Sequence, residues 1–315
     1  MNKLVDLLGI RVPIIQGGMG NISNAPLTAA VSNAGGLGTI GAGTMLPDEV
    51  EEIIKETKKL TNKPFAINIA LSVSPYVKEV LSLVVKYKIS TVSLSAGNPS
   101  PYIPKLKEHG VNVICVVASP KQAVKAEKAG ADIIVAEGYE AAGINSNLET
   151  TTFALIPQIA ESVTVPIAAA GGIADGKGLA AALALGASGV QMGTRLIATK
   201  EAPVHEAYKN TIVTADDKGT VIVGRTVGRV RRVLRTPYAE YLLQKEAEGI
   251  SLEEFNSLTT ENQHKFGALE GKLQEGFLNG GQISSLITTI PSVKELFENI
   301  IHEAKSELQR ATHLI

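Results

Sequence analysis

Residues 165–199 hold two glycine-containing turns whose residue types suit the binding of a phosphate group. The stretch reads VPIAAAGGIADGKGLAAALALGASGVQMGTRLIAT, with Gly171-Gly172 after one apolar run and Gly193-Thr194 after the next. Glycine lets the backbone approach a ligand closely, and unpaired N–H groups at a helix start carry partial positive charge. The alternative is that the glycines only permit tight packing of a helix on a strand. Two such turns on successive strands favour the phosphate site.

Polar side chains follow most of the other apolar runs, at the points where these runs end. In a barrel of parallel strands the carboxyl ends share one face, and barrel enzymes carry their active sites there. Most of these side chains are uncharged, which suits a planar heterocycle with several donors and acceptors better than a metal ion. Glu137 and Glu140 are a nearby pair of carboxylates, and either could instead clamp the following loop. The candidates are Gln16, Asn68, Ser95, Asn98, Glu137, Glu140, Asn145 and Gln191.

Eight apolar runs alternating with helical segments are expected to position these residues. The runs show little alternation of apolar and polar residues, as strands buried on both faces require. Their number and period predict the α/β class and a (β/α)8 TIM barrel rather than an open doubly wound sheet. The runs are Val12–Ile15, Leu37–Ile40, Phe65–Ile69, Thr91–Leu94, Val111–Val116, Ile133–Val135, Val165–Ala170 and Gly189–Met192.

Residues 36–41 match the spacing G-x-G-x-x-G of a dinucleotide-binding turn. That fingerprint needs glycines between a strand and the helix that follows it. Here the glycines follow a helical segment and run through a predicted strand. We therefore reject a dinucleotide fingerprint at this position.

The alternation of apolar runs and helical segments stops after Thr199. We therefore predict that the chain has three segments. Residues 1–202 form the barrel, and residues 203–279 form a small helical lid or substrate subdomain without a second series of strands. Residues 280–315 return to the barrel and end in a helix over 292–309. Apolar residues at helical spacing predict the face of that helix that docks on the barrel. This stripe comprises Val293, Leu296, Ile300, Ala304 and Leu308.

Composition narrows the class of protein. The formal net charge is −1, so nothing indicates nucleic acid or an anionic membrane as the main partner. No uninterrupted apolar stretch is long enough to span a membrane, and Arg11 and Pro13 stand where a secretory signal would be apolar. The single cysteine, Cys115, lies within an apolar run and is expected to be buried and inert. These features predict a cytoplasmic protein.

The segment 203–279 carries two groups of residues with a possible role in the site. His205 and His264 are the histidines placed to reach it, since the other three lie on helical or terminal segments. Five arginines are expected to face solvent or to pair within their own subdomain. The alternative is that they attract an acidic group such as a nucleotide or carrier phosphate. They are Arg225, Arg229, Arg231, Arg232 and Arg235.

Seven motifs in one order together resemble a known family. They read QGGM, AGGLG, PFAINI, SAGNP, EGYEAAG, AAAGGIADGKGLAAALALGASGVQMGTR and GGQIS. The chain resembles, over nearly its whole length, the nitronate monooxygenases (2-nitropropane dioxygenases) and the flavin-dependent enoyl-acyl-carrier-protein reductases. The resemblance implies an FMN-containing barrel with a helical second domain. It places FMN against Gly17, Gly18, Met19, Asn68, Glu137, Gly171, Gly172, Gly193, Thr194 and Gln282.

One position departs from the family pattern. Members usually read EAGGH after the sixth strand, with a histidine that serves as base in nitronate oxidation or supports enoyl reduction. Here the stretch reads EAAGIN, and Ile144 takes the histidine position. Isoleucine cannot transfer a proton, so the catalytic residue is unknown. Asn145 could contact a substrate but is a poor acid or base near neutral pH.

These observations leave four hypotheses for function. The first is an FMN-dependent oxidoreductase of the nitronate monooxygenase type, which oxidises alkyl nitronates with O2. The second uses the same FMN with NADH or NADPH to reduce an enoyl thioester or a quinone. A third is a flavin-binding protein whose turnover is weakened by Ile144. A fourth is a phosphate-binding barrel isomerase or aldolase without flavin. A small-molecule substrate is expected in each active case, and a homodimer remains open.

Overall fold

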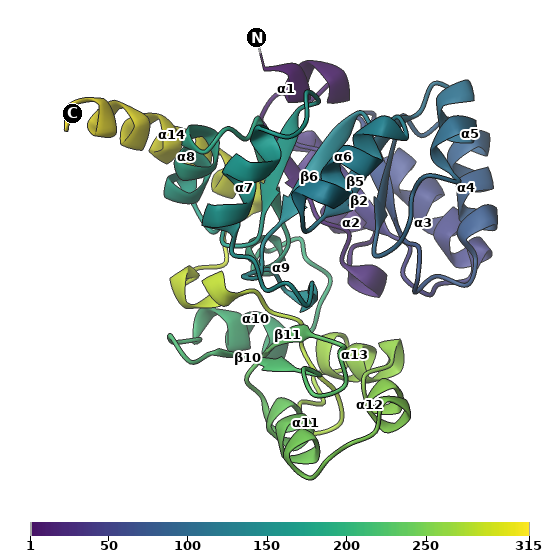
Figure 1. Ribbon diagram of the computed structural model, residues 1–315, viewed down its shortest axis with the longest axis vertical. Coiled ribbons are helices and arrows are strands. Elements are labelled where there is room, and N and C mark those ends of the chain that lie inside the picture. The colour runs from purple at the N-terminus through teal and green to yellow at the C-terminus, as the bar shows by residue number, and fades with distance from the viewer. Residues whose placement is uncertain (1, 315) are drawn as a thin grey trace.

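The computed structural model describes residues 2–314 and places eight parallel strands in one closed sheet (Figure 1). The order around the sheet is β1-β9-β8-β6-β5-β4-β3-β2. Leu37 N–H donates to Ile14 O (3.0 Å) and Gln16 N–H to Leu37 O (2.9 Å), which closes the ring. The predicted TIM barrel is confirmed. Its strands are β1 (Ile14–Gln16), β2 (Gly38–Gly41), β3 (Phe65–Ala70), β4 (Thr91–Ser95), β5 (Asn112–Val117), β6 (Ile133–Glu137), β8 (Ile167–Ala170) and β9 (Gly189–Met192).

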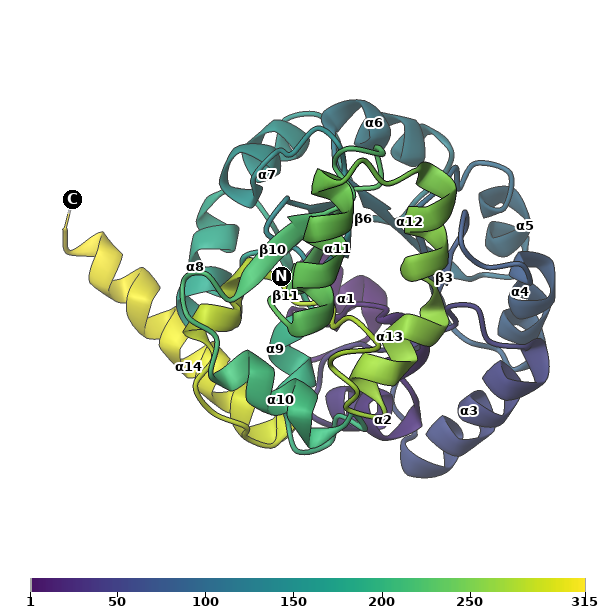
Figure 2. The same ribbon diagram turned by 90° about the horizontal axis from the view of Figure 1, so that it is seen from below.

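Helices surround the barrel, and the last helix of the chain completes their ring (Figure 2). The helix α14 packs between α8 and α2, and Gly176 N–H donates to Glu303 Oε2 (2.8 Å). The predicted docking of this helix is confirmed, except that Leu308 is 40% exposed and lies beyond the contact. The ring comprises α2 (Ala25–Asn33), α3 (Pro47–Leu60), α4 (Val77–Lys86), α5 (Ile103–Glu108), α6 (Pro120–Lys128), α7 (Thr152–Ala160), α8 (Gly176–Ala184) and α14 (Val293–Thr312).

The barrel interior is filled by side chains from alternate strand positions, including Ile15, Ile114 and Val135. Leu4 and Leu8 of α1 (Lys3–Leu8) pack into this cluster and close the amino-terminal end of the barrel. Cys115 belongs to the outer layer between strands and helices, and burial beside Asp132 raises the pKa of its thiol to about 12. The expectation of a buried cysteine is confirmed.

The glycines at 36–41 allow three close backbone contacts around β2. A Cβ on Gly36 would lie 2.6 Å from Ile14 O, and one on Gly41 would lie 2.5 Å from Gly20 O. A Cβ on Gly38 would overlap the carbonyl oxygen of Thr28 on α2. Their spacing therefore serves close packing of α2 and β1 against β2, in agreement with the rejection of a dinucleotide turn.

Gly38→Ala should destabilise the barrel because backbone atoms of α2 would have to move. We expect the free energy of unfolding to fall by about 3 kcal/mol in urea denaturation. Gly193→Ala is the matched control, since its Cβ would meet nothing nearer than Met19 Sδ at 3.6 Å. Equal losses in the two variants would contradict the packing role of Gly38.

Residues 203–279, here called the lid, lie over the carboxyl-terminal mouth of the barrel (Figures 1 and 2). The lid has its own apolar core around Phe255 and Phe277. Its helices are α10 (Glu206–Val213), α11 (Pro237–Ala247), α12 (Leu252–Leu258) and α13 (Glu261–Ala268). The short elements α9 (Thr194–Ile197), η1 (Gly20–Ile22) and η2 (Gln282–Leu286) lie outside it. No helix within residues 2–314 is long and apolar enough to cross a membrane.

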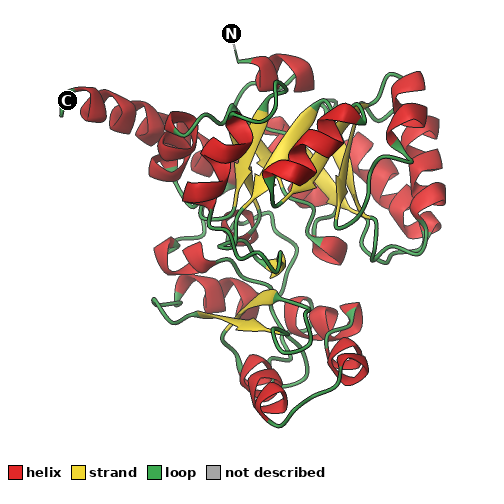
Figure 3. Ribbon diagram, in the orientation of Figure 1, coloured by secondary structure: helices red, strands yellow, loops and turns green. Residues whose placement is uncertain are grey.

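The lid is mainly helical, as expected, but it also contains a β-hairpin that the sequence analysis did not predict (Figure 3). The strands β10 (Thr220–Val223) and β11 (Arg231–Leu234) pair antiparallel. A third strand, β7 (Gly143–Ile144), joins β11 although it belongs to the loop after β6. The residues of β10, TVIV, are all β-branched and do fit a strand, whereas β11 opens with two arginines and gives no clear strand pattern in the sequence.

Candidate active site

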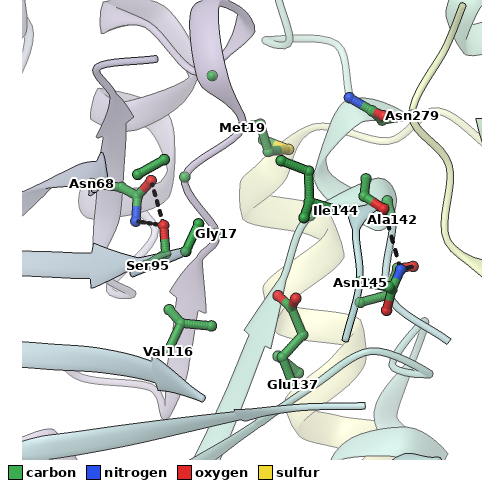
Figure 4. A pocket seen from close by; sticks show the side chains of 18 of the residues that line it. Gly17, Met19, Asn68, Ser95, Val116, Glu137, Ala142, Ile144, Asn145 and Asn279 are labelled. Carbon is green, nitrogen blue, oxygen red and sulfur yellow. Dashed lines mark hydrogen bonds between the residues drawn. The ribbon is translucent and has the colours of Figure 1, made fainter. Parts of the chain in front are cut away.

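A cavity of about 910 Å³ is lined by loops at the carboxyl ends of the barrel strands and by lid residues (Figure 4). Gln282 does not line it, since its side chain is exposed and its backbone N–H donates to Glu140 O (2.9 Å). Its neighbours Gly281 and Ile283 do. The other predicted cofactor residues all line the cavity, namely Gly17, Gly18, Met19, Asn68, Glu137, Gly171, Gly172, Gly193 and Thr194.

The two glycine turns lie next to each other because β8 and β9 are paired, with Ala170 opposite Gln191. Gly171 and Gly172 have φ of +85° and +78°, a conformation that favours glycine. Within residues 2–314, no hydrogen-bond acceptor is recorded for the backbone N–H groups of Gly172, Gly193 and Thr194. Free N–H groups on adjacent turns can bind an anion.

Asn68 and its serine partners form one wall of the cavity. Asn68 Nδ2 donates to Ser93 Oγ (3.1 Å) and Ser95 Oγ (3.2 Å), which fixes the amide. A Cβ on Gly18 would overlap Cβ of Asn68, so this glycine allows the β1 loop to lie directly on the amide. This wall therefore presents the fixed side-chain amide of Asn68 next to the backbone of Gly18.

Glu137 presents a carboxyl group without a hydrogen-bond partner among the described residues, and Figure 4 shows it pointing into the cavity. Burial raises the pKa of Glu137 to about 7. Glu140 differs, because its Oε2 accepts hydrogen bonds from Thr152 N (2.8 Å) and Thr152 Oγ1 (2.9 Å). Of Glu137 and Glu140, it is therefore Glu140 that clamps the following loop.

Two further candidate residues have their amide groups occupied by the fold. Gln16 is fully buried in the barrel wall, where Nε2 donates to Thr39 O (2.9 Å), so the prediction that it faces the mouth is wrong. Asn145 lines the cavity, but its Nδ2 donates to Ala141 O (2.9 Å) and Gly143 O (3.2 Å). The remaining candidates, Ser95, Asn98 and Gln191, line the cavity as expected.

The lid contributes polar residues that the sequence did not single out as a group, namely Arg231, Glu261, His264 and Asn279. His264 is 3% exposed, with Nδ1 lying 3.3 Å from Glu261 Oε1 and Nε2 lying 3.3 Å from Asn279 Nδ2. Arg231 was expected to face solvent or to pair with a partner, yet it lines the cavity. His205, the other candidate histidine, caps α10 instead by accepting from Ala207 N.

Comparison with known proteins assigns the chain to a family. A family model described as nitronate monooxygenase matches residues 1–80 and 70–303. The chain belongs to the nitronate monooxygenase family. A probable nitronate monooxygenase of Staphylococcus saprophyticus is 31% identical, over 98% of this chain and 99% of the relative. Membership of the nitronate monooxygenase family makes this protein an oxidoreductase enzyme.

Other similar proteins illustrate the range of activities near this family. An indene-carboxyl-CoA dehydrogenase of Mycobacterium tuberculosis is 33% identical, over 99% of this chain and 98% of the relative. The structure of FabK from Thermotoga maritima matches with a TM-score of 0.96 and 42% identity, covering 100% of this chain and 99% of that one. A nitroalkane oxidase of Streptomyces ansochromogenes matches with a TM-score of 0.85 and 27% identity, covering 98% and 99%.

Ile144 stands at the position where the family resemblance leads us to expect a histidine. Ile144 lines the cavity and is 51% exposed (Figure 4). No cluster of histidine, cysteine, aspartate and glutamate able to hold a metal ion occurs within residues 2–314. The ionisable side chains that line the cavity are Lys125, Glu137 and Glu140 from the barrel and Tyr208, Arg231, Glu261 and His264 from the lid.

Replacing Glu137 should change stability in a pH-dependent way. The folded protein keeps this carboxyl protonated up to about pH 7, whereas the unfolded chain ionises it near 4.5, so wild type loses stability as pH rises through that interval. The flavin-free Glu137→Gln variant should match wild type below about pH 4.5 and be more stable by up to about 3 kcal/mol near pH 8.

Urea denaturation at both pH values measures this difference. Glu253→Gln removes an exposed glutamate of α12 and serves as the control, for which we expect no comparable gain near pH 8. A stability difference between Glu137→Gln and wild type that is the same at both pH values would refute the assignment.

Proposed function

We propose that this oxidoreductase binds FMN in the cavity and uses it to reduce the double bond of an enoyl thioester. The likeness to Thermotoga maritima FabK, at 42% identity over the whole chain, carries this proposal. We take FabK to stand for the enoyl-acyl-carrier-protein reductases among the proteins that the sequence resembles. The relatives from Mycobacterium tuberculosis and Rhodococcus jostii are named as dehydrogenases of a CoA ester, which supports a thioester substrate. NADH or NADPH would be the reductant.

The residues present fit FMN. The free N–H groups of Gly172, Gly193 and Thr194 would hold its phosphate, since they lie on adjacent turns without partners among the described residues. Asn68 and the unpartnered carboxyl of Glu137 would meet polar groups of the ring. When bound, FMN supplies hydride transfer between the nicotinamide and the substrate.

Apolar side chains of the cavity would receive the acyl part of the substrate. Met19, Ile144 and Ile283 line it together, from the β1 loop, the β6 loop and η2. Their surfaces exclude water from the reacting carbons and leave the polar end of the thioester to the lid residues. Ile144 itself moves no proton, so its contribution is to shape this wall.

Nitronate oxidation by O2 is the second candidate. The description of the matching family model and the staphylococcal relatives favour it. A nitronate is already deprotonated, so its oxidation does not require a base at position 144. The same cavity and the same flavin would serve either substrate.

Spectroscopy and rapid kinetics test the proposal. We expect the purified protein to show oxidised-flavin absorption, NADH or NADPH to bleach it, and crotonyl-CoA to restore it without O2. Propyl-2-nitronate with O2 is the comparison substrate. Rapid turnover of the nitronate, with no reoxidation by crotonyl-CoA, would select the second candidate.

Two other outcomes would count against the proposal. A colourless protein that binds no added FMN would contradict the cofactor assignment and favour a flavin-free phosphate-binding barrel. Turnover that appears only in Ile144→His would identify a flavin-binding protein with weakened activity.

A further inference from the structure

The lid places one guanidinium group in the cavity with most of its hydrogen-bonding capacity unused. Arg231 lies on β11, and its recorded hydrogen bond within residues 2–314 is a long one, 3.5 Å from Nη1 to Asn279 Oδ1. Its guanidinium lies 4.8 Å from the centre of the Phe277 ring. Burial lowers the pKa of Arg231 to about 10, so the group remains a cation near neutral pH. A guanidinium has five N–H donors, and Arg231, which lines the cavity, makes this one hydrogen bond within residues 2–314.

The neighbouring lid arginines provide a contrast. Arg225 and Arg235 each form a salt bridge with a glutamate. Arg232 donates to the carbonyl of Tyr139 and to a threonine hydroxyl. No salt bridge to Arg231 is found within residues 2–314, although it is the lid arginine that lines the cavity. The Glu261 carboxylate acts on Arg231 electrostatically but forms no salt bridge with it and pairs with His264 instead, so the guanidinium keeps donors for a negatively charged ligand atom.

Arg231 lies beside the loop after β6, close to Ile144. Arg231 stands directly opposite Ile144 in the β11–β7 ladder, so the two side chains lie on the same face. Asn279, its contact, lies against the same loop, since a Cβ on Gly143 would be 3.7 Å from Asn279 Cγ. The cation therefore approaches from the lid the place where the family pattern has its histidine.

A chain of polar contacts fixes the amide beside Arg231. His264 Nδ1 faces the Glu261 carboxylate, which favours the tautomer with the proton on Nδ1; in that tautomer Nε2 accepts from Asn279 Nδ2. This orientation turns Asn279 Oδ1 toward the guanidinium. Burial raises the pKa of Glu261, but His264 and Arg231 outweigh it and keep the carboxyl ionised. Asn279, His264 and Glu261 are thus positioning residues for Arg231.

We propose that Arg231 is a catalytic residue that binds the negatively charged oxygen of the reacting substrate. This inference rests on the proposed function. In enoyl thioester reduction, hydride adds to the β-carbon and the electron pair of the double bond moves onto the carbonyl oxygen, giving an enolate. Arg231 stabilises that oxygen until the α-carbon takes a proton from water. A nitronate carries the same feature, a planar group with an anionic oxygen.

Anion binding tests this role without turnover. Butanoate, a stable planar oxyanion with a short acyl chain, serves as the probe and is titrated against the oxidised FMN-loaded protein by flavin difference absorption. We expect a saturable change in wild type and at least a tenfold weaker dissociation constant in Arg231→Gln. Arg235→Gln removes an arginine from the exposed side of the same hairpin and should bind as wild type does.

Steady-state kinetics provide the second measurement. They use crotonyl-CoA or propyl-2-nitronate, whichever the wild-type enzyme turns over faster. We expect kcat/KM to fall about 100-fold in Arg231→Gln and about tenfold in Arg231→Lys. Lysine keeps the positive charge but lacks the planar pair of N–H groups with which a guanidinium binds an oxyanion. Added guanidinium should restore part of the activity of Arg231→Ala, an effect that a structural role would not produce. If Arg231→Gln fails to fold, Arg231→Lys decides in both assays.

The outcomes separate this inference from the proposed function. Wild type that binds no butanoate, or variants that bind and turn over as wild type does, would overturn the role of Arg231 while the flavoenzyme assignment stands. Wild type without flavin or without turnover would overturn the proposed function first. Loss in Arg235→Gln equal to that in Arg231→Gln would also reject a specific oxyanion site.

Discussion

The parallel pairing of β8 with β9 is the constraint on which the site depends. It sets two turns side by side, and the backbone of each turn leaves N–H groups facing the cavity. Main-chain donors cannot swing away as side chains do, so the positions of these N–H groups are set by the barrel itself. The rest of the cavity is assembled around that fixed end by loops from β1, β3 and β6 and by the lid.

The barrel and the lid divide the chemistry between them. The barrel supplies backbone donors, the fixed amide of Asn68 and the carboxyl of Glu137. The lid supplies the Arg231 guanidinium and the His264 imidazole, both of which lie near Phe277 in its own core. In the β6 loop the Glu140 carboxylate is held by Thr152 and Ile144 is apolar, so the other polar groups near Ile144 come from lid residues distant in sequence.

Much of this arrangement could be predicted from the sequence, since apolar runs and glycine turns are local signals. The barrel strands were found because each is buried on both faces. In the lid hairpin, β11 was hard to predict because it opens with the charged residues Arg231 and Arg232, although three of its four residues are buried. Gln16 was misplaced because β1 and β2 close the ring with few backbone bonds, and its side chain completes them at Thr39. Hydrogen bonds between residues far apart in the sequence cannot be predicted from the spacing of residue types.

The strand β7 has a consequence for how this protein can diverge. Arg232 pairs with Gly143 and Arg231 with Ile144, and Asn145 N–H donates to Val230 O (2.9 Å), so a barrel loop is woven into the sheet of the lid. The two parts are therefore not interchangeable modules. A chimera that exchanged lids between relatives would need to carry residues 143–145 along with the hairpin, and sequence drift in one segment constrains drift in the other.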